Sequence, residues 1–291
     1  MTHNKKTDFF RASLIFGALF CTLLLSVWSA RSDAAPVELR ISPKLVATAE
    51  YLEGKRGKPA IILVHGFLQT REFPTIARLA SGVAEQGYTV LAPTLTLGVP
   101  RRNQSLPCEA IHMHSFESDV AELARWVTWL RARGHRQIIM IGHSFGSLQS
   151  LAHASSPSNG VSKVIALSLV DNREVSNRNS LATLREAQRR AERGDTGLMN
   201  SPFSYCKEFP TTAAYYVSYA SWDPARILDL VKSVRVPVEI IVGSKDGRMG
   251  ADWTERLRAQ GASVHTINGA NHFFDDQYEF DLLESVLARL D

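Results

Sequence analysis

Short apolar runs bounded by turn-forming residues recur along the chain from residue 37 onward. Eight of these runs have the length and the residue types that are typical of strands. They cover residues 37–41, 45–52, 60–64, 88–92, 137–141, 163–169, 236–242 and 263–267. Only a short turn separates the first two runs, which predicts an opening hairpin.

Amphipathic stretches separate most of these strands. Their apolar residues recur at helical spacing and their charged residues lie on the opposite face, which predicts crossover helices. They cover residues 73–86, 116–133, 145–155, 252–260 and 275–290. Because strand, helix and strand repeat in this way, we expect an α/β fold with a mostly parallel eight-stranded sheet flanked by helices.

The repeat is interrupted once, over about residues 172–225. An arginine-rich helix is expected at residues 181–193, followed by glycine, proline and aromatic residues without strand periodicity. We interpret this segment as a lid inserted into one domain that covers residues 35–291. The lid arginines can attract an anionic substrate, but glutamates are interspersed among them, which favours a solvated helix face.

Residues 1–34 have the pattern of an export signal. Lys5, Lys6 and Arg11 precede residues 12–30, which carry no charge. Cleavage near residue 31 or residue 35 would release the domain. If uncleaved, the apolar run is close to the about 20 residues that span a bilayer and would act as a membrane anchor. Both alternatives place the domain outside the cytoplasm, in the periplasm or the extracellular space.

Composition and charge narrow the possible partners. The chain is 45% hydrophobic and 21% charged, as globular proteins are. Its net charge of +4 comes partly from the first 34 residues, and no basic run is interleaved with aromatic residues. A nucleic-acid partner is therefore not expected. The sequence does not determine the oligomeric state.

Cys108 and Cys206 can form a disulfide in an oxidising compartment or remain two buried thiols.

The strongest chemical signal is Gly142-His143-Ser144-Phe145-Gly146, a G-x-S-x-G motif between the strand at 137–141 and the helix at 145–155. Glycines permit a tight, strained turn that exposes the serine hydroxyl above the sheet. A serine hydroxyl is a poor nucleophile until a base removes its proton. The motif therefore requires a histidine elsewhere in the fold.

In this context the sequence resembles the α/β-hydrolase superfamily, whose nucleophile, acid and histidine follow one another in that order. The resemblance implies Ser144 as nucleophile, Asp246 as acid and His272 as general base. Asp246 follows the strand at 236–242, and His272 follows the strand at 263–267. Asp171, at the end of another strand, is the alternative acid.

The resemblance also implies an oxyanion hole made by the backbone N–H groups of Phe67 and Phe145. Phe67 ends the His65-Gly66-Phe67 turn after the strand at 60–64, and His65 is expected to be structural. His112 and His114 are two residues apart, but no further ligand completes a metal site, and they can instead line the pocket mouth.

These features predict an exported serine hydrolase that acts on a small-molecule acyl substrate and needs no cofactor or metal. Carboxylic ester hydrolysis through an acyl-enzyme is the expected reaction. A peptidase or amidase of the same fold is one alternative. A catalytically inactive binding protein on a hydrolase scaffold is the other.

Overall fold

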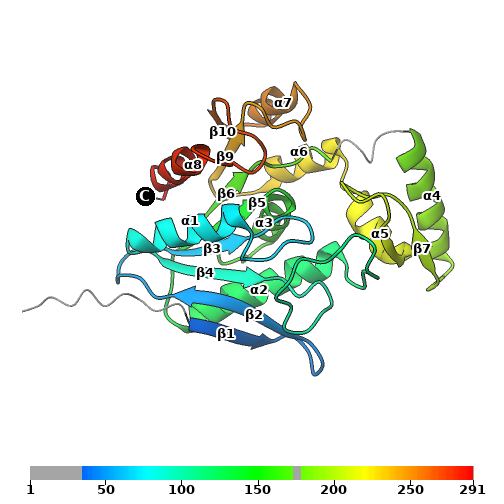
Figure 1. The fold of residues 1–291 in the computed structure, drawn as a ribbon, viewed down its shortest axis with the longest axis horizontal. Helices are drawn as coiled ribbons and strands as arrows, with labels where there is room; N and C mark the ends of the chain where they lie inside the picture. Colours follow the sequence, from blue (N-terminus) through cyan, green and yellow to red (C-terminus); the bar gives the residue numbers. More distant parts are fainter. Residues whose placement is uncertain (1–34, 173–177, 291) are drawn as a thin grey trace, which may run out of the picture. The chain divides into compact units, whose positions relative to one another are not determined.

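An eight-stranded sheet organises the chain in the order β1-β2-β4-β3-β5-β6-β9-β10. The computed structural model describes residues 35–172 and 178–290, so the predicted signal segment and part of the predicted lid lie outside the described residues. β1 and β2 pair antiparallel, β2 pairs antiparallel with β4, and all later pairs are parallel (Figure 1). The strands are β1 (Ala35–Arg40), β2 (Val46–Leu52), β3 (Ala60–Val64), β4 (Thr89–Thr94), β5 (Ile138–His143), β6 (Lys163–Leu167), β9 (Val238–Gly243) and β10 (Ser263–Ile267).

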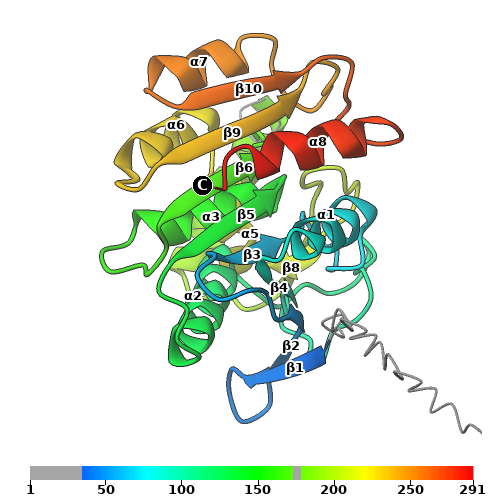
Figure 2. The ribbon, with the colours of Figure 1, turned by 90° about the vertical axis from the view of Figure 1, so that its left-hand side faces the viewer.

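Helices cover both faces of this sheet. Figure 2 shows α1 and α8 on one face, with α2, α3 and α6 on the other. Their bounds are α1 (Pro74–Glu85), α2 (Phe116–Ala132), α3 (Phe145–Ser155), α6 (Pro224–Ser233), α7 (Trp253–Ala259) and α8 (Tyr278–Leu287). The expected sheet and the five expected helices are thus confirmed, and α6 is a further helix that the sequence analysis did not predict.

Alternation along the central strands builds two hydrophobic cores. Ile61 and Leu63 of β3 point into the core under α1 and α8, whereas Ile62 and Val64 point into the core under α2 and α3. A strand buried on both faces is continuously apolar, and this is why β3 has no polar position. The two cores hold the carboxyl ends of the parallel strands at one edge of the sheet.

The interrupting segment contains more regular structure than the sequence predicts. α4 (Arg178–Glu192) corresponds to the expected helix, and it packs against α5 (Ala213–Ala220) beyond that edge of the sheet (Figure 1). The expectation that this segment contains no strands was wrong, because β7 (Leu198–Asn200) and β8 (Pro210–Thr212) pair antiparallel. Each of these strands has only three residues, which is too short for an alternating pattern to be recognised in the sequence. Within the described residues, no helix is both long and apolar enough to cross a membrane.

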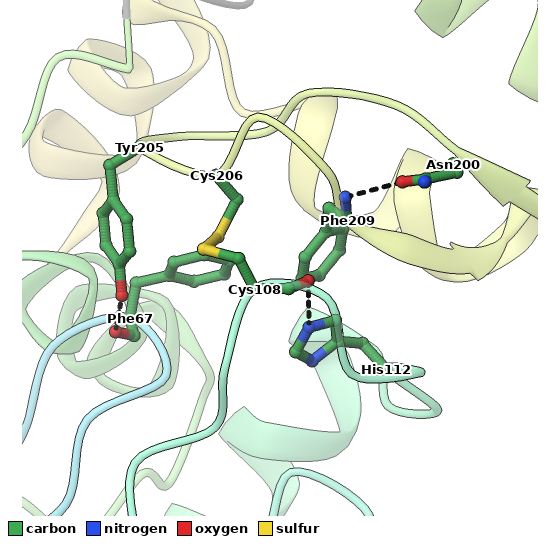
Figure 3. The surroundings of a disulfide bond; sticks show 7 residues. All are labelled: Phe67, Cys108, His112, Asn200, Tyr205, Cys206 and Phe209. Carbon is green, nitrogen blue, oxygen red and sulfur yellow. Dashed lines mark hydrogen bonds between the residues drawn. A yellow bond between two sulfur atoms is a disulfide. The ribbon is translucent and has the colours of Figure 1, made fainter.

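A disulfide joins Cys108, in the loop after β4, to Cys206, in the loop between β7 and β8 (Figure 3). The two cysteines are 98 residues apart in the sequence. Of the two alternatives for these thiols, the structure shows the paired one. The bond ties the interrupting segment to a loop of the main sheet.

Replacing both cysteines by serine should lower the free energy of unfolding by about 2–4 kcal/mol, because a cross-link over so long a loop restricts the unfolded chain. Urea unfolding of the oxidised protein and of the double variant measures the difference. A reductant should destabilise the wild type and leave the variant unchanged. Identical wild-type curves with and without reductant would contradict a stabilising disulfide.

Candidate active site

Ser144 stands at the sharp turn where β5 ends and α3 begins, with φ +57° and ψ −122°. A non-glycine residue rarely adopts this backbone conformation, so the turn stores strain. A Cβ at Gly142 would lie 2.2 Å from the Gly146 carbonyl oxygen, and one at Gly146 would lie 2.5 Å from the carbonyl oxygen of Val64. Close backbone packing therefore demands both glycines of the motif.

A chain of hydrogen bonds connects Ser144, His272 and Asp246, all three of which are buried. His272 Nε2 lies 3.0 Å from Ser144 Oγ, and His272 Nδ1 lies 2.7 Å from Asp246 Oδ2. If Nδ1–H donates to the carboxylate, Nε2 is left to accept the serine proton. The geometry is that of a nucleophile, a base and an orienting acid.

The electrostatics of Asp246 suit an ionised carboxylate. Burial acts to raise its pKa, but the hydrogen bond and charge of His272 and the backbone N–H of Arg248 outweigh burial, and the pKa is lowered overall. Asp171, the alternative acid, accepts instead from the backbone N–H of Gly250 at 2.7 Å. Of the two candidates, the structure brings Asp246 to the imidazole.

Two side chains that the sequence analysis did not single out hold the His272 backbone. His143 Nε2 donates to the His272 carbonyl oxygen at 2.9 Å, and Ser168 Oγ donates to the same oxygen at 3.0 Å. Burial, with the neighbouring His272, lowers the pKa of His143 to about 3, so its ring is neutral at pH 7. The only sequence signal for His143 is its place beside Ser144 in the motif.

The turn that carries Phe67 lies against Ser144. A Cβ at Gly66 would be 3.3 Å from Ser144 Cβ and 2.7 Å from Gln69 Oε1. Phe145 is the first residue of α3, where a backbone N–H has no acceptor within the helix. Phe67 and Phe145, the two residues expected to supply the oxyanion donors, thus both lie near Ser144 and line the same pocket.

A buried arginine holds this turn by hydrogen bonds to its backbone. Arg102 is 3% exposed and donates to the carbonyl oxygens of Gln69 at 2.6 Å, Leu95 at 2.7 Å and Gln104 at 2.9 Å. Burial lowers its pKa to about 10, which leaves the guanidinium charged at pH 7. No local sequence pattern signals this role, because its partners are backbone carbonyls of two loops and the His65 ring, 3.2 Å from Nη2.

His65 has the structural role expected for it. Its Nε2 accepts from the Leu95 backbone N–H at 3.0 Å, so Nδ1 carries the proton that is donated to the Gly66 carbonyl oxygen at 2.9 Å. Burial first, and then the charge of Arg102, lower the pKa of His65 to about 3. A neutral imidazole with a hydrogen bond at each ring nitrogen therefore connects the Phe67 turn to the end of β4.

His112 and His114, the alternative candidates for the pocket mouth, are not among the residues that line the pocket beside Ser144. His112 stacks on Phe209 with ring centroids 4.2 Å apart (Figure 3), and His114 pairs with the buried Asp119 carboxylate at 3.1 Å. Both side chains turn inward to pack. Across residues 35–172 and 178–290, no three His, Cys, Asp or Glu side chains are grouped to hold a metal.

A pocket of about 230 Å³ opens beside Ser144. It is lined by Phe67, Gln69, Ser144, Phe145, Val170, Asn172, Ser204, Tyr205, Arg248 and Phe273. The interrupting segment contributes Tyr205, whose hydroxyl donates to the Phe67 carbonyl oxygen at 3.0 Å (Figure 3). The described arginines of α4 do not line the pocket, and Arg189 and Arg190 pair with Glu186 and Asp195. The solvated face is therefore the better description of that helix.

Comparison with known proteins identifies the family of this chain. Residues 61–280 match the alpha/beta hydrolase family. The chain belongs to this family. A search of curated protein sequences finds no match.

Solved structures share the fold at low sequence identity. The α/β hydrolase GrgF from Penicillium sp. sh18 is 17% identical with a TM-score of 0.67, over 88% of this chain and 96% of that one. Est1E from Butyrivibrio proteoclasticus is 15% identical with a TM-score of 0.61, over 88% and 99%. A monoacylglycerol lipase from Paleococcus ferrophilus is 16% identical with a TM-score of 0.61, over 84% and 98%.

The buried carboxyl group of Glu122 predicts how the free energy of unfolding depends on pH. Glu122 is buried and accepts from the backbone N–H and the hydroxyl of Thr96 at 3.0 and 2.6 Å. Burial raises its pKa from 4.5 to about 7. Between these two pH values the folded protein therefore keeps a proton on Glu122 that the unfolded chain has lost. The contribution of this group to the unfolding free energy is fully present below pH 4.5 and is lost as the pH rises through 7.

Compared with Glu122→Gln, the wild type should lose about 3 kcal/mol of unfolding free energy between about pH 4.5 and pH 8, at about 1.4 kcal/mol for each unit of pKa shift. Urea unfolding of both proteins across this range measures the change. Glu117→Gln, at an exposed position of α2, is the matched control and should differ from wild type by about 0.5 kcal/mol or less throughout. A constant difference between wild type and Glu122→Gln would be inconsistent with a buried, protonated carboxyl.

Proposed function

We propose that this hydrolase cleaves carboxylic esters of small-molecule substrates through an acyl-enzyme formed on Ser144. The observation that carries the proposal is the hydrogen-bond chain from Ser144 Oγ through His272 to Asp246. The solved structure of Est1E with ferulic acid bound gives further support, since a protein of this fold accommodates a small carboxylic acid.

The reaction begins when His272 Nε2 takes the Ser144 proton and Oγ attacks the ester carbonyl carbon. The negative charge that forms on the carbonyl oxygen is stabilised by the N–H groups of Phe67 and Phe145. His272 then gives its proton to the departing alcohol oxygen, which leaves the acyl group on Ser144. A water molecule, deprotonated by His272, attacks this acyl-enzyme and releases the acid.

Each supporting contact has a part in this sequence of steps. Asp246 fixes the His272 tautomer and stabilises the imidazolium that forms. His143 and Ser168 hold the backbone from which the imidazole projects. Arg102 holds the Phe67 turn, so the oxyanion donors do not need to reorganise when charge develops.

Export of the protein is part of the proposal. The basic and then apolar pattern of residues 1–34 supports a signal peptide or an N-terminal anchor. The Cys108–Cys206 disulfide adds support, because disulfides persist in oxidising compartments and are rare in the cytoplasm. The substrate is then an ester of the periplasm or the extracellular space.

Ser144→Ala should lower kcat for p-nitrophenyl ester hydrolysis by about 10⁴-fold or more, because the nucleophile is lost. Steady-state kinetics of the folded variant measures this, with Ser155→Ala at the far end of α3 as the matched control. Aminoacyl anilides assayed in parallel separate an esterase from an amidase. Turnover by Ser144→Ala within tenfold of wild type would overturn the mechanism.

Asp246→Asn should reduce kcat by about 10³–10⁴-fold, because an amide favours the wrong imidazole tautomer and does not stabilise the imidazolium. Asp171→Asn, which changes the other carboxylate at the end of a strand, should cost less than about tenfold. The same ester assay compares the two variants. The opposite ranking would assign the acid to Asp171.

A further inference from the structure

The pocket beside Ser144 has one charged side chain among its described lining residues, and that side chain is a cation. Arg248 comes from the loop after β9 that also carries Asp246. Its backbone N–H donates to Asp246 Oδ1 at 2.9 Å. The turn that positions the Asp246 carboxylate therefore also fixes the backbone of Arg248.

Two aromatic rings position the guanidinium. Its central carbon lies 5.0 Å from the ring centroid of Phe273 and 5.5 Å from that of Tyr205. Phe273 follows the triad histidine, and Tyr205 precedes a disulfide cysteine, so both rings are on well-anchored backbone. Cation–π contacts of this length orient a guanidinium without using its N–H donors.

Those donors do not pair with an acidic side chain that the structure describes. Among the residues that the structure describes, no carboxylate forms an ion pair with Arg248, whereas Arg101 and Arg190 each pair with one. The nearest acid in sequence, Asp246, accepts from His272 and from the Arg248 backbone instead. A guanidinium is always charged, and its planar fork matches a carboxylate in a bidentate arrangement.

We infer that Arg248 makes this hydrolase selective for esters that carry an anionic group, such as a second carboxylate, close to the scissile bond. The inference rests on the proposed function and names its substrate class. A pocket of about 230 Å³ is small, below the about 300 Å³ at which most ligand pockets begin. The reacting carbonyl and the anion of one substrate therefore lie in the same pocket.

Two matched substrate pairs test the selectivity. Mono-p-nitrophenyl adipate and p-nitrophenyl hexanoate differ by a carboxylate on the acyl side. 4-Carboxyphenyl butyrate and 4-(methoxycarbonyl)phenyl butyrate differ on the alcohol side, where a carboxylate in the first is a methyl ester in the second. In at least one pair, the wild type should favour the anion in kcat/KM by about tenfold or more, as a charged hydrogen-bonded pair provides. A ratio near one in both pairs would overturn the inference.

Variants then assign the selectivity to the side chain. Arg248→Gln should reduce the ratio of anionic to neutral kcat/KM by about tenfold, and Arg248→Glu should bring it below one. A ratio cancels any general damage that reaches the triad through Asp246. Arg256→Gln, whose guanidinium lies over Trp253 outside the pocket, should keep the wild-type ratio. An unchanged ratio in Arg248→Gln would remove Arg248 as the determinant.

A binding measurement separates this inference from the proposed function. If the wild type hydrolyses none of the four esters, ester hydrolysis fails, and calorimetric titration with monomethyl adipate decides the inference. Binding that Arg248→Gln weakens by about tenfold or more supports the anion site. No binding, or equal binding by both proteins, overturns it.

Discussion

Close packing of backbone against backbone at the start of α3 is the constraint on which the active site depends. Gly146 approaches the carbonyl oxygens of Val64 and His65 so closely that no side chain fits between α3 and the end of β3. This approach forces Ser144 into a strained conformation that presents its hydroxyl at the edge of the sheet. It also brings the turn containing Phe67 beside Ser144.

Buried polar contacts convert that close packing into a preorganised site. His143 and Ser168 hold the His272 carbonyl, while Arg102 and His65 hold the Phe67 turn. Both histidines stay neutral because burial lowers their pKa values, and a neutral ring can donate from one nitrogen. Because the polar groups of such a site are already oriented, they do not need to reorganise when charge develops during the reaction. The disulfide extends the same rigidity to Tyr205 at the pocket wall.

The sheet, its flanking helices and the positions of Ser144, Asp246 and His272 were predictable because they depend on periodicity and on motifs at strand ends. Parallel strands bring their carboxyl ends to one edge, so chain order is sufficient to expect proximity. Asp171 and Asp246 both end strands, and only the folded loops distinguish them. No local pattern marks Arg102 or Arg248, since Arg102 bonds mainly to backbone carbonyl groups and Arg248 packs on rings from two other loops.

The central claim is that Ser144 is the activated nucleophile of this fold. Treatment of the full-length protein with a fluorophosphonate, followed by peptide mass spectrometry, tests it most directly, because only an activated serine is phosphonylated rapidly. We predict one phosphonyl group for each chain, on the peptide that contains Ser144. A folded protein that remains unlabelled, or that carries the label on a different residue, would contradict the account.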